Sequence, residues 1–477
     1  MKNNIGHKGF LHSIGILASG TVIAQVIGIC IFPLLTRFYS PEDFGILAIY
    51  MSVLAIFTIV VTLRYQLAIP IVEKDDDALY LVVLCLLINV VITTICTILI
   101  YSYGENILAL LGASDLSPYV WLIPLGMFFS GLYQTLNYWA IRVKDFKNIA
   151  ISKVLQVTVM AGVQLLGYKF GIASLILGQA LGQSAGSTTL AKSIFRFKKK
   201  SIFRPSKLKE QAVKYRCYPL FDTWAALANT SGSQLPPLLF TAFFGPAVGG
   251  YYLLAHRIVS TPITVIGQAV GDVFISQAAE AWRNNNLHIL FEKIVKKLIM
   301  LSMPLVIYLM IASPILFESV FGGKWREAGE YARYLSIWLG MVLVCSPLST
   351  LYLVLEKQKQ GMIFQMSMTI VRIFVICYGF YMSDVILTII LFSGVGVLFW
   401  FGFLNWIAIQ VKSNSFFVLI CFFKSAVYSG LLCLPLLIGT VLDLAPLLWW
   451  FLAIISAVLI LIYYILQLRD LGGHHEY

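Results

Sequence analysis

Charged side chains are scarce in this sequence. Asp, Glu, Lys and Arg together make up 12% of its 477 residues, whereas a soluble domain carries about a quarter. Hydrophobic residues make up 59%, so the chain has too few charges to cover a surface that faces water. This scarcity excludes an ordinary soluble domain and predicts a polytopic membrane protein.

Motifs for catalysis and metal binding are also missing. The eight cysteines show no metal-ligand or redox spacing, and there is no Gly-rich phosphate loop, nucleophile elbow or zinc-protease helix motif. The run Asp75-Asp76-Asp77 resembles a metal-binding carboxylate cluster, but no nucleotide-binding domain surrounds it, and we interpret it as a solvated turn. His474 and His475, on a short tail, predict no metal site. We therefore expect no enzyme, no cofactor and no metal.

Long apolar runs dominate what the sequence does contain, and they predict fourteen membrane-spanning helices. The first run is long enough to span, and no small-residue cleavage site precedes it, so we expect no cleavable signal peptide. The predicted spans cover residues 13–36, 44–63, 78–101, 118–141, 149–168, 171–191, 218–242, 249–275, 295–317, 334–355, 362–382, 385–411, 416–440 and 445–468.

The net charge of +12 is distributed unevenly along the chain. Most of the 34 Lys and Arg residues fall on the loops that share a side with the N-terminus, which predicts that both termini are cytoplasmic. The largest loop, Lys192 to Arg216, faces inside and is expected to touch anionic lipid headgroups. Outward loops are short, even the longest, near Glu318 to Arg333. We therefore attribute the positive net charge to membrane topology, and we expect no nucleic acid as a partner.

The two halves of the chain resemble each other. Pro41 and Gly45 open the second predicted span, and Pro246 and Gly250 open the eighth at the same spacing. Because six spans separate the copies, both have the same orientation, which predicts two lobes related by an axis along the membrane normal. The expected fold is an all-α membrane protein with two six-helix lobes in a parallel repeat and two extra C-terminal helices.

These predictions divide the chain into four parts. The N-terminal six-helix lobe covers residues 1–193, and a basic cytoplasmic linker covers 194–217. The C-terminal lobe covers 218–411, and the two additional helices with a short tail cover 412–477.

The stretch from Gly249 to Glu280 is one long apolar run with the pair His256-Arg257 inside it. Arg257 would lie about 12 Å from Gly249 along the helix, where an arginine is costly unless it faces protein or water. We predict that it lines a polar cavity between helices. The alternative is that it reaches the near interface or pairs with a structural carboxylate.

Four more basic residues lie in predicted spans or at their edge: Arg64, Lys153, Arg372 and Lys424. Acidic residues are scarcer there, so we predict an electropositive cavity for an anionic substrate. Arginine suits phosphate because its planar fork binds two oxygens at once. The alternative is that these cations pair with backbone carbonyls or with carboxylates at inner helix ends, such as Asp222, and only hold helices together.

Polar uncharged side chains recur at depth as well. Gln25 and Gln234 lie on the first helix of each predicted lobe, and with His256 they are the polar lining that we expect to contact a sugar. The alternative is hydrogen bonding between helices, which is common in membrane bundles.

Several motifs occur in an order that resembles a known family. They are PLLTRFYSPEDFG at 33–45, LRYQLA at 63–68, RVKDF at 142–146, GYYLLAHR at 250–257 and FGGKWREAG at 321–329. Together they resemble the Wzx-type polysaccharide-biosynthesis flippases of the multidrug/oligosaccharidyl-lipid/polysaccharide exporter superfamily, and the likeness extends to the end of the twelfth span. The extra pair of spans resembles the fourteen-span lipid II flippase branch.

This resemblance implies a MATE-like fold and a carrier in the bacterial inner membrane. Such a flippase moves undecaprenyl-diphosphate-linked oligosaccharide, the repeat unit of O-antigen or another surface polysaccharide, from the cytoplasmic to the periplasmic leaflet by alternating access. The resemblance also implies cavity cations near Arg64 and Arg257, coupling to an H⁺ or Na⁺ gradient, and a polysaccharide polymerase and a chain-length regulator as partners.

Two other functions remain as alternatives. A MATE-type cation or drug antiporter would need buried carboxylates for its cationic substrate. An integral-membrane polysaccharide polymerase would need a long outward loop with catalytic residues.

Overall fold

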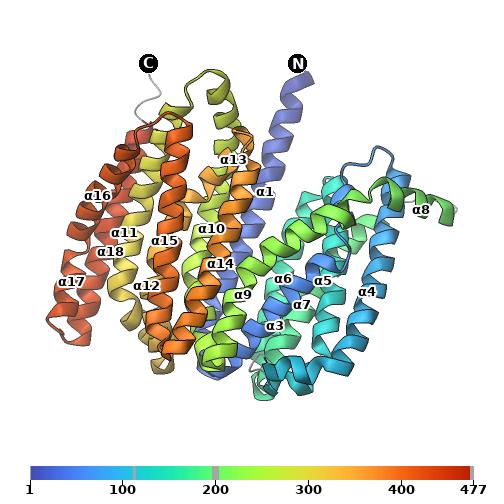
Figure 1. Cartoon of the computed structure of the whole chain (residues 1–477), viewed down its shortest axis with the longest axis horizontal. Coiled ribbons are helices and arrows are strands. Elements are labelled where there is room, and N and C mark those ends of the chain that lie inside the picture. The colour runs from blue at the N-terminus through green and yellow to red at the C-terminus, as the bar shows by residue number, and fades with distance from the viewer. Residues whose placement is uncertain (1, 111–113, 196–203, 473–477) are drawn as a thin grey trace. The chain divides into compact units, whose positions relative to one another are not determined.

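The computed structural model describes residues 2–110, 114–195 and 204–472, and these residues form helices and turns without a strand (Figure 1). The all-α class predicted from the apolar runs is confirmed. The basic run at 196–203 and the two histidines of the C-terminal tail lie outside the described residues. The chain forms two compact units, residues 1–253 and residues 254–477. The predicted division into two lobes, a linker and an added helix pair stays a prediction.

Unit 1 is built from nine helices and the first two turns of a tenth. Short 3₁₀ segments follow α3, α4 and α6, and a π-helical turn at Tyr218–Asp222 leads into α9. The helices are α1 (Lys2–Cys30), α2 (Phe32–Phe38), α3 (Pro41–Val60), α4 (Asp75–Leu110), α5 (Leu122–Arg142), α6 (Phe146–Leu166), α7 (Ile172–Phe195), α8 (Pro205–Lys214), α9 (Thr223–Phe244) and the start of α10 (Pro246–Arg283).

Unit 2 contains the rest of α10 and eight further helices. A 3₁₀ turn at Gly323–Trp325 precedes α12, and another at Pro347–Thr350 precedes α13. The helices are α11 (Leu287–Phe321), α12 (Arg326–Cys345), α13 (Leu351–Val354), α14 (Gln358–Met382), α15 (Val385–Gln410), α16 (Ser415–Leu432), α17 (Leu434–Val441) and α18 (Pro446–Gly472).

Each of the fourteen predicted spans falls on one of these helices or on a pair of helices separated by a break. Nine helices of the described chain are long and apolar enough to cross a membrane, and the count rises to eleven if each of two bent pairs is one span. α5, α7 and α9 are not among them. These three carry polar side chains along their length, such as Gln134, Gln183 and Gln234, which lowers their hydropathy.

Local sequence explains where several helices begin and end. Ser40 and Asp43 form a capping box at the start of α3, in which each side chain binds the other residue's backbone amide. Gly245 ends α9 with φ of 94°, and Gly322 ends α11 with φ of 107°. A side chain would strain the backbone at such angles, so glycine is the suitable residue at both turns.

The repeated Pro and Gly residues contact each other. A side-chain carbon on Gly45 of α3 would overlap the carbonyl of Pro246 in α10, and one on Gly250 would overlap the carbonyl of Pro41. The starts of α3 and α10 therefore cross at backbone distance, in a reciprocal arrangement that only small residues permit. This reciprocal contact lies entirely within unit 1.

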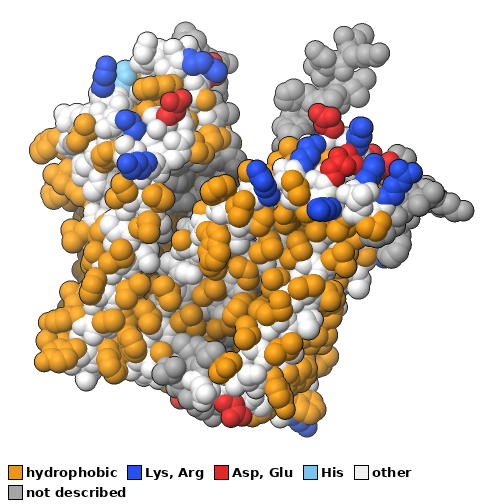
Figure 2. All heavy atoms as spheres, turned by 45° about the vertical axis from the view of Figure 1, so that its right-hand side comes forward, with side chains coloured by type: hydrophobic (Ala, Val, Ile, Leu, Met, Phe, Trp, Pro, Cys, Tyr) orange, Lys and Arg blue, Asp and Glu red, His pale blue; other side chains and the backbone are white. Residues whose placement is uncertain are grey.

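The exterior of each unit is apolar. On the face drawn in Figure 2, hydrophobic side chains cover the flanks, and most Lys and Arg side chains lie towards one end of each unit. Inside unit 2, side chains from α11, α12, α15 and α16 form a buried cluster that includes Phe291, Val344, Phe403 and Ile407. Apolar flanks around an apolar core are what a bilayer requires, and the chain is a multi-pass membrane protein.

Candidate functional site

Arg372 lies in the interior of unit 2, on α14. Its side chain is only 7% exposed. The guanidinium carbon lies 4.0 Å from the ring centre of Trp338 and 4.4 Å from that of Phe392. These rings belong to α12 and α15, so the cation joins three helices. Desolvated cation–π contacts stabilise by about 2 kcal/mol or more, which offsets part of the cost of burying the charge.

A glycine makes room for this stack. A side-chain carbon at Gly396 of α15 would overlap both the guanidinium of Arg372 and the indole of Trp338. Trp338 also meets Phe392 edge to face, with ring centres 5.4 Å apart. The stack of Trp338, Arg372 and Phe392 is therefore set by close packing on three sides.

His256 and Arg257 lie next to this stack, on α10. The ring of His256 is half-buried and lies 5.9 Å from that of Trp338, tilted by 31°. The side chain of Arg257 is exposed, and it forms no ion pair with any residue that the structure describes. Arg257 and Arg372 both act electrostatically on His256. Three of the predicted site residues therefore share one neighbourhood, in which no carboxylate pairs with Arg257.

Arg64 has a different environment, in unit 1. Its Nε donates to the carboxylate of Asp222 over 2.7 Å, and the two side chains are 25% and 41% exposed. Arg64 also has φ of 62°, a left-handed conformation that is rare outside glycine. The ion pair therefore connects the turn after α3 with the start of α9. The alternative of an inner-end carboxylate partner describes Arg64 better than a free cavity cation does.

Lys153 and Gln25 belong to a second group in unit 1, between α6 and α1. The ammonium of Lys153 donates to Thr21 Oγ1 over 2.9 Å. Gln25 lies one turn beyond Thr21, and its Oε1 is buried without a hydrogen bond from the described residues. Gln234 is half-buried on α9. These three residues belong to unit 1, and the group around His256 belongs to unit 2.

Lys424 lies on α16 with an exposed side chain. Lys424 and Lys296 of α11 both lie within electrostatic range of Cys421. Cys421 of α16 therefore has two lysines around it, one from α11 and one from α16 itself.

The Asp75 run begins a helix. Asp75, Asp76 and Asp77 form the first turn of α4, where negative charge is favourable. The guanidinium of Arg142 binds Asp75 at 2.9 Å and donates to the carbonyl of Ile69 at 2.8 Å. The prediction of a solvated turn was wrong in one respect, because the run begins a helix and Asp75 is paired with Arg142. No group of metal-binding side chains occurs among the described residues.

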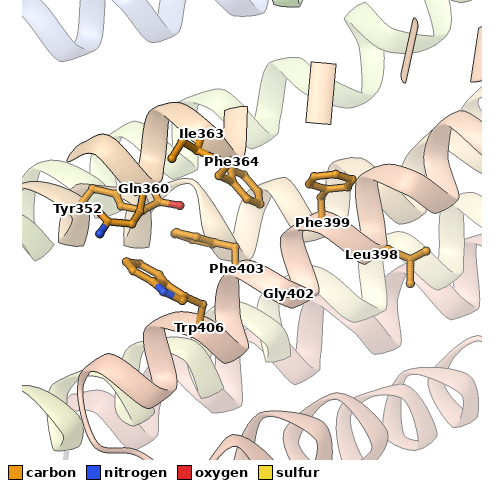
Figure 3. Close-up of a pocket in the computed structure, with 9 residues that line it drawn as sticks. All are labelled: Tyr352, Gln360, Ile363, Phe364, Leu398, Phe399, Gly402, Phe403 and Trp406. Atoms are coloured by element: carbon orange, nitrogen blue, oxygen red, sulfur yellow. The ribbon is translucent and has the colours of Figure 1, made fainter. Parts of the chain in front are cut away.

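Unit 2 also contains an apolar hollow of about 490 Å³ between α13, α14 and α15. The rings of Phe364, Phe403 and Trp406 surround it, together with Tyr352 and Gln360 (Figure 3). None of its nine lining residues is charged. This hollow suits an apolar chain and not the anion that the arginines predict.

The comparison with protein families decides the relationship. The family model described as polysaccharide biosynthesis protein matches residues 34–330, more than half of the chain. The chain belongs to this family. The resemblance noted in the motifs is confirmed at the level of polysaccharide biosynthesis.

One relative with a described role supports membership of this family over a short stretch. Teichuronic acid biosynthesis protein TuaB of Bacillus subtilis (strain 168) is 31% identical over 118 residues. The match covers 24% of this chain and 24% of that protein, so the chain spans about a quarter of the length of this relative.

Solved structures show the fold. A lipid II flippase MurJ in an inward closed conformation matches with a TM-score of 0.75 at 16% identity, over 95% of this chain and 99% of that one. An inward-facing multidrug resistance MATE family transporter of the MOP superfamily matches with a TM-score of 0.64 at 15% identity, over 82% and 94%. The predicted all-α, MATE-like fold is confirmed.

Phe392 and Gly396 were missed in the sequence. A phenylalanine and a glycine in an apolar span carry no sign of a nearby charge. Arg372 itself was the signal, because a buried arginine needs partners within reach. Which side chains those are depends on how the three helices pack.

Proposed function

We propose that the chain is a flippase for lipid-linked oligosaccharide. It would move undecaprenyl-diphosphate-linked repeat units of a surface polysaccharide, such as O-antigen, from the cytoplasmic to the periplasmic leaflet by alternating access. Membership of the polysaccharide biosynthesis family and the transporter fold support this assignment. On this proposal the chain works as a carrier and not as an enzyme.

The observation that carries the proposal is the positive charge around Arg257. Arg257 is exposed and forms no ion pair within the described chain. Arg372 is buried against the ring of Trp338, and the ring of His256 lies next to that of Trp338. A site with two arginines, in which no carboxylate of the described residues pairs with Arg257, attracts anions and repels cations. This argues for a diphosphate and against the cationic substrate of a drug antiporter.

The two arginines would have different tasks. The fork of Arg257 is available to bind two oxygens of the carrier-lipid diphosphate in a bidentate manner. Arg372 is held between two rings, so it would add positive potential without leaving its place. His256 would offer a hydrogen bond to the first sugar, and Gln25, Gln234, Lys153 and Arg64 remain proposed as further lining.

The setting of the carrier is part of the same proposal. The excess of Lys and Arg on the loops that share a side with the N-terminus supports an orientation with both termini in the cytoplasm, and the location proposed is the bacterial inner membrane. Uphill transport would draw on an H⁺ or Na⁺ gradient. A polysaccharide polymerase and a chain-length regulator would receive the exported units.

Replacing Arg257 tests the proposal. In a strain that lacks its own copy, Arg257→Ala should reduce surface polysaccharide about 10- to 100-fold, because a bidentate charge-assisted contact contributes roughly 1.5–3 kcal/mol. Lipid-linked repeat units should accumulate at the cytoplasmic leaflet. Arg257→Lys should recover part of the polymer, since it keeps the charge and loses the fork.

Arg326→Ala is the matched control, because Arg326 lies at a helix start and pairs with Glu318 at 2.7 Å. It should leave the polymer unchanged, and all variants should reach the membrane in equal amounts. Normal polymer from Arg257→Ala would reject the proposal. A deletion strain with normal polymer but altered drug sensitivity would favour the antiporter instead.

A further inference from the structure

The surface of unit 2 formed by α11, α16 and α18 combines lysines with an apolar flank. α11 and α16 run parallel: Ser413, just before α16, donates to Glu292 at 2.6 Å, and Ser425 donates to the carbonyl of Ile299. In Figure 1 these helices lie together with α18, whose Tyr464 donates to the carbonyl of Leu301 at 2.6 Å. The hydrogen bonds fix which residues of the three helices share a level.

Two lysines from distant parts of the chain meet at one level of this surface. Lys424 precedes Ser425 on α16, and Lys296 lies one turn before Ile299 on α11. Both are exposed, and both lie within electrostatic range of Cys421, as does the carboxylate of Glu292 one turn before Lys296. Neither lysine forms an ion pair with a residue that the structure describes. Lys293, one turn before Lys297, is exposed at the same end of α11.

The sequence of α11 indicates the depth of these lysines. Residues 298–317 contain no charged side chain, and about 20 such residues cross the hydrocarbon of a bilayer. This uncharged run begins directly after Lys297, so Lys296 lies at the level of the lipid headgroups. Tyr464, bonded at Leu301, and Tyr428, one turn beyond Lys424, lie just further in, where tyrosine is enriched in membrane proteins.

The neighbours of Lys424 on its own face of α16 are apolar and exposed. They are Ile420 one turn before it and Val427, Tyr428 and Leu431 one to two turns after it. A lone phosphate would pair with the ammonium but would leave these apolar side chains uncovered. A molecule with a phosphate head and hydrocarbon chains covers both parts of the surface.

We propose that the surface around Lys296 and Lys424 binds an anionic phospholipid. The two ammonium groups would hold the lipid phosphate, and the acyl chains would lie along the apolar face of α16 beyond Lys424. Lys424 then serves a lipid of the surrounding leaflet instead of the transported substrate. This inference does not depend on the proposed function, because it uses neither Arg257 nor the Arg372 stack.

Binding of fluorescent phosphatidylglycerol to the purified full chain in neutral detergent tests the proposal. Exchanging both lysines, Lys296→Gln with Lys424→Gln, should raise the Kd about 20- to 30-fold, since each lysine near a lipid surface contributes about a fivefold effect. Lys296→Arg with Lys424→Arg should keep the wild-type Kd within about threefold. Phosphatidylcholine should bind much more weakly than phosphatidylglycerol.

The matched control is Lys209→Gln with Lys214→Gln, which removes two exposed lysines from α8 of unit 1. It should change the Kd less than twofold. A Kd of the Lys296 and Lys424 glutamine variant within twofold of wild type would overturn the proposal, as would equal binding of the two lipids. Displacement of the lipid by equimolar inorganic phosphate would show a simple anion site and would also overturn it. Equal melting temperatures of the variants exclude a folding effect.

Discussion

Arg64 in unit 1 and Arg372 in unit 2 are the same residue type in two opposite environments. A carboxylate neutralises Arg64, whose side chain keeps a quarter of its surface exposed. Arg372 is nearly inaccessible, and two aromatic rings flank its guanidinium. Rings stabilise a cation without cancelling its charge. The guanidinium of Arg372 is therefore stabilised by aromatic faces, and that of Arg64 by an opposite charge.

The difference predicts how strongly each unit depends on its arginine. The Arg372 stack is dry and joins three helices, so its contacts act at low effective dielectric and resist salt. The ion pair of Arg64 is partly exposed, and such pairs contribute little because water and ions screen them. Three experiments would break or sharpen this contrast.

The largest effect is expected from Trp338→Ala. The change removes a large buried ring and one face of the stack, and it should lower the free energy of unfolding by about 3–5 kcal/mol. Chemical denaturation in mixed micelles measures this loss. Trp224→Ala is the control, because that indole is 65% exposed on α9, and it should cost below about 1 kcal/mol outside a bilayer. Equal losses for both variants would contradict a special role of the stack.

A medium effect is expected from Gly396→Ala. The added methyl group meets both the guanidinium of Arg372 and the indole of Trp338, so it should cost about 1–3 kcal/mol through overpacking. Gly394 and Gly402 on the same helix have no heavy atom within 4 Å of an added carbon. Their alanine variants should be neutral or more stable by up to about 1 kcal/mol, because alanine favours a helix. The same denaturation assay distinguishes the three, and a neutral Gly396→Ala would refute the tight stack.

The smallest effect is expected from breaking the ion pair in unit 1. A double-mutant cycle with Arg64→Gln and Asp222→Asn should give a coupling energy of about 0.2–1 kcal/mol. About 1 M salt should reduce this coupling, since ions screen exposed charges. A coupling energy above roughly 2 kcal/mol that did not change with salt concentration would mean that Arg64 is held as firmly as Arg372. The contrast between the two units would then be lost.

The helical organisation could be predicted from the sequence because hydropathy is a local property. Each predicted span lies on a helix, and the bends at Cys433 and Ser346 fall within predicted spans. The partners of the cations could not be predicted in the same way. Asp222 lies 158 residues from Arg64, and it was named only as one of several inner-end carboxylates. Pairing at that separation depends on which helices become neighbours.

Lys424 is a second example of what could not be predicted from the sequence. Its place in an apolar run predicted a cation that lines a cavity, because hydropathy alone does not distinguish a lumen from a membrane boundary. The hydrogen bonds between α11 and α16 supply the missing register and bring Lys296 to the same level. The site assignment of Arg257, in contrast, rests on the lack of an ion-pairing partner among the described residues, which no sequence pattern could reveal.

The reciprocal contact of Gly45 with Pro246 and of Gly250 with Pro41 has a consequence for how these helix ends are held together. At each glycine the nearest atoms are backbone atoms of the facing helix, so the contact at these positions is backbone against backbone. The two proline carbonyls already accept bonds within their own helices, as in any α-helix. Separating these helix ends would leave neither carbonyl without its hydrogen bond. The two helix ends can therefore approach closely although no hydrogen bond of these two carbonyls holds them together.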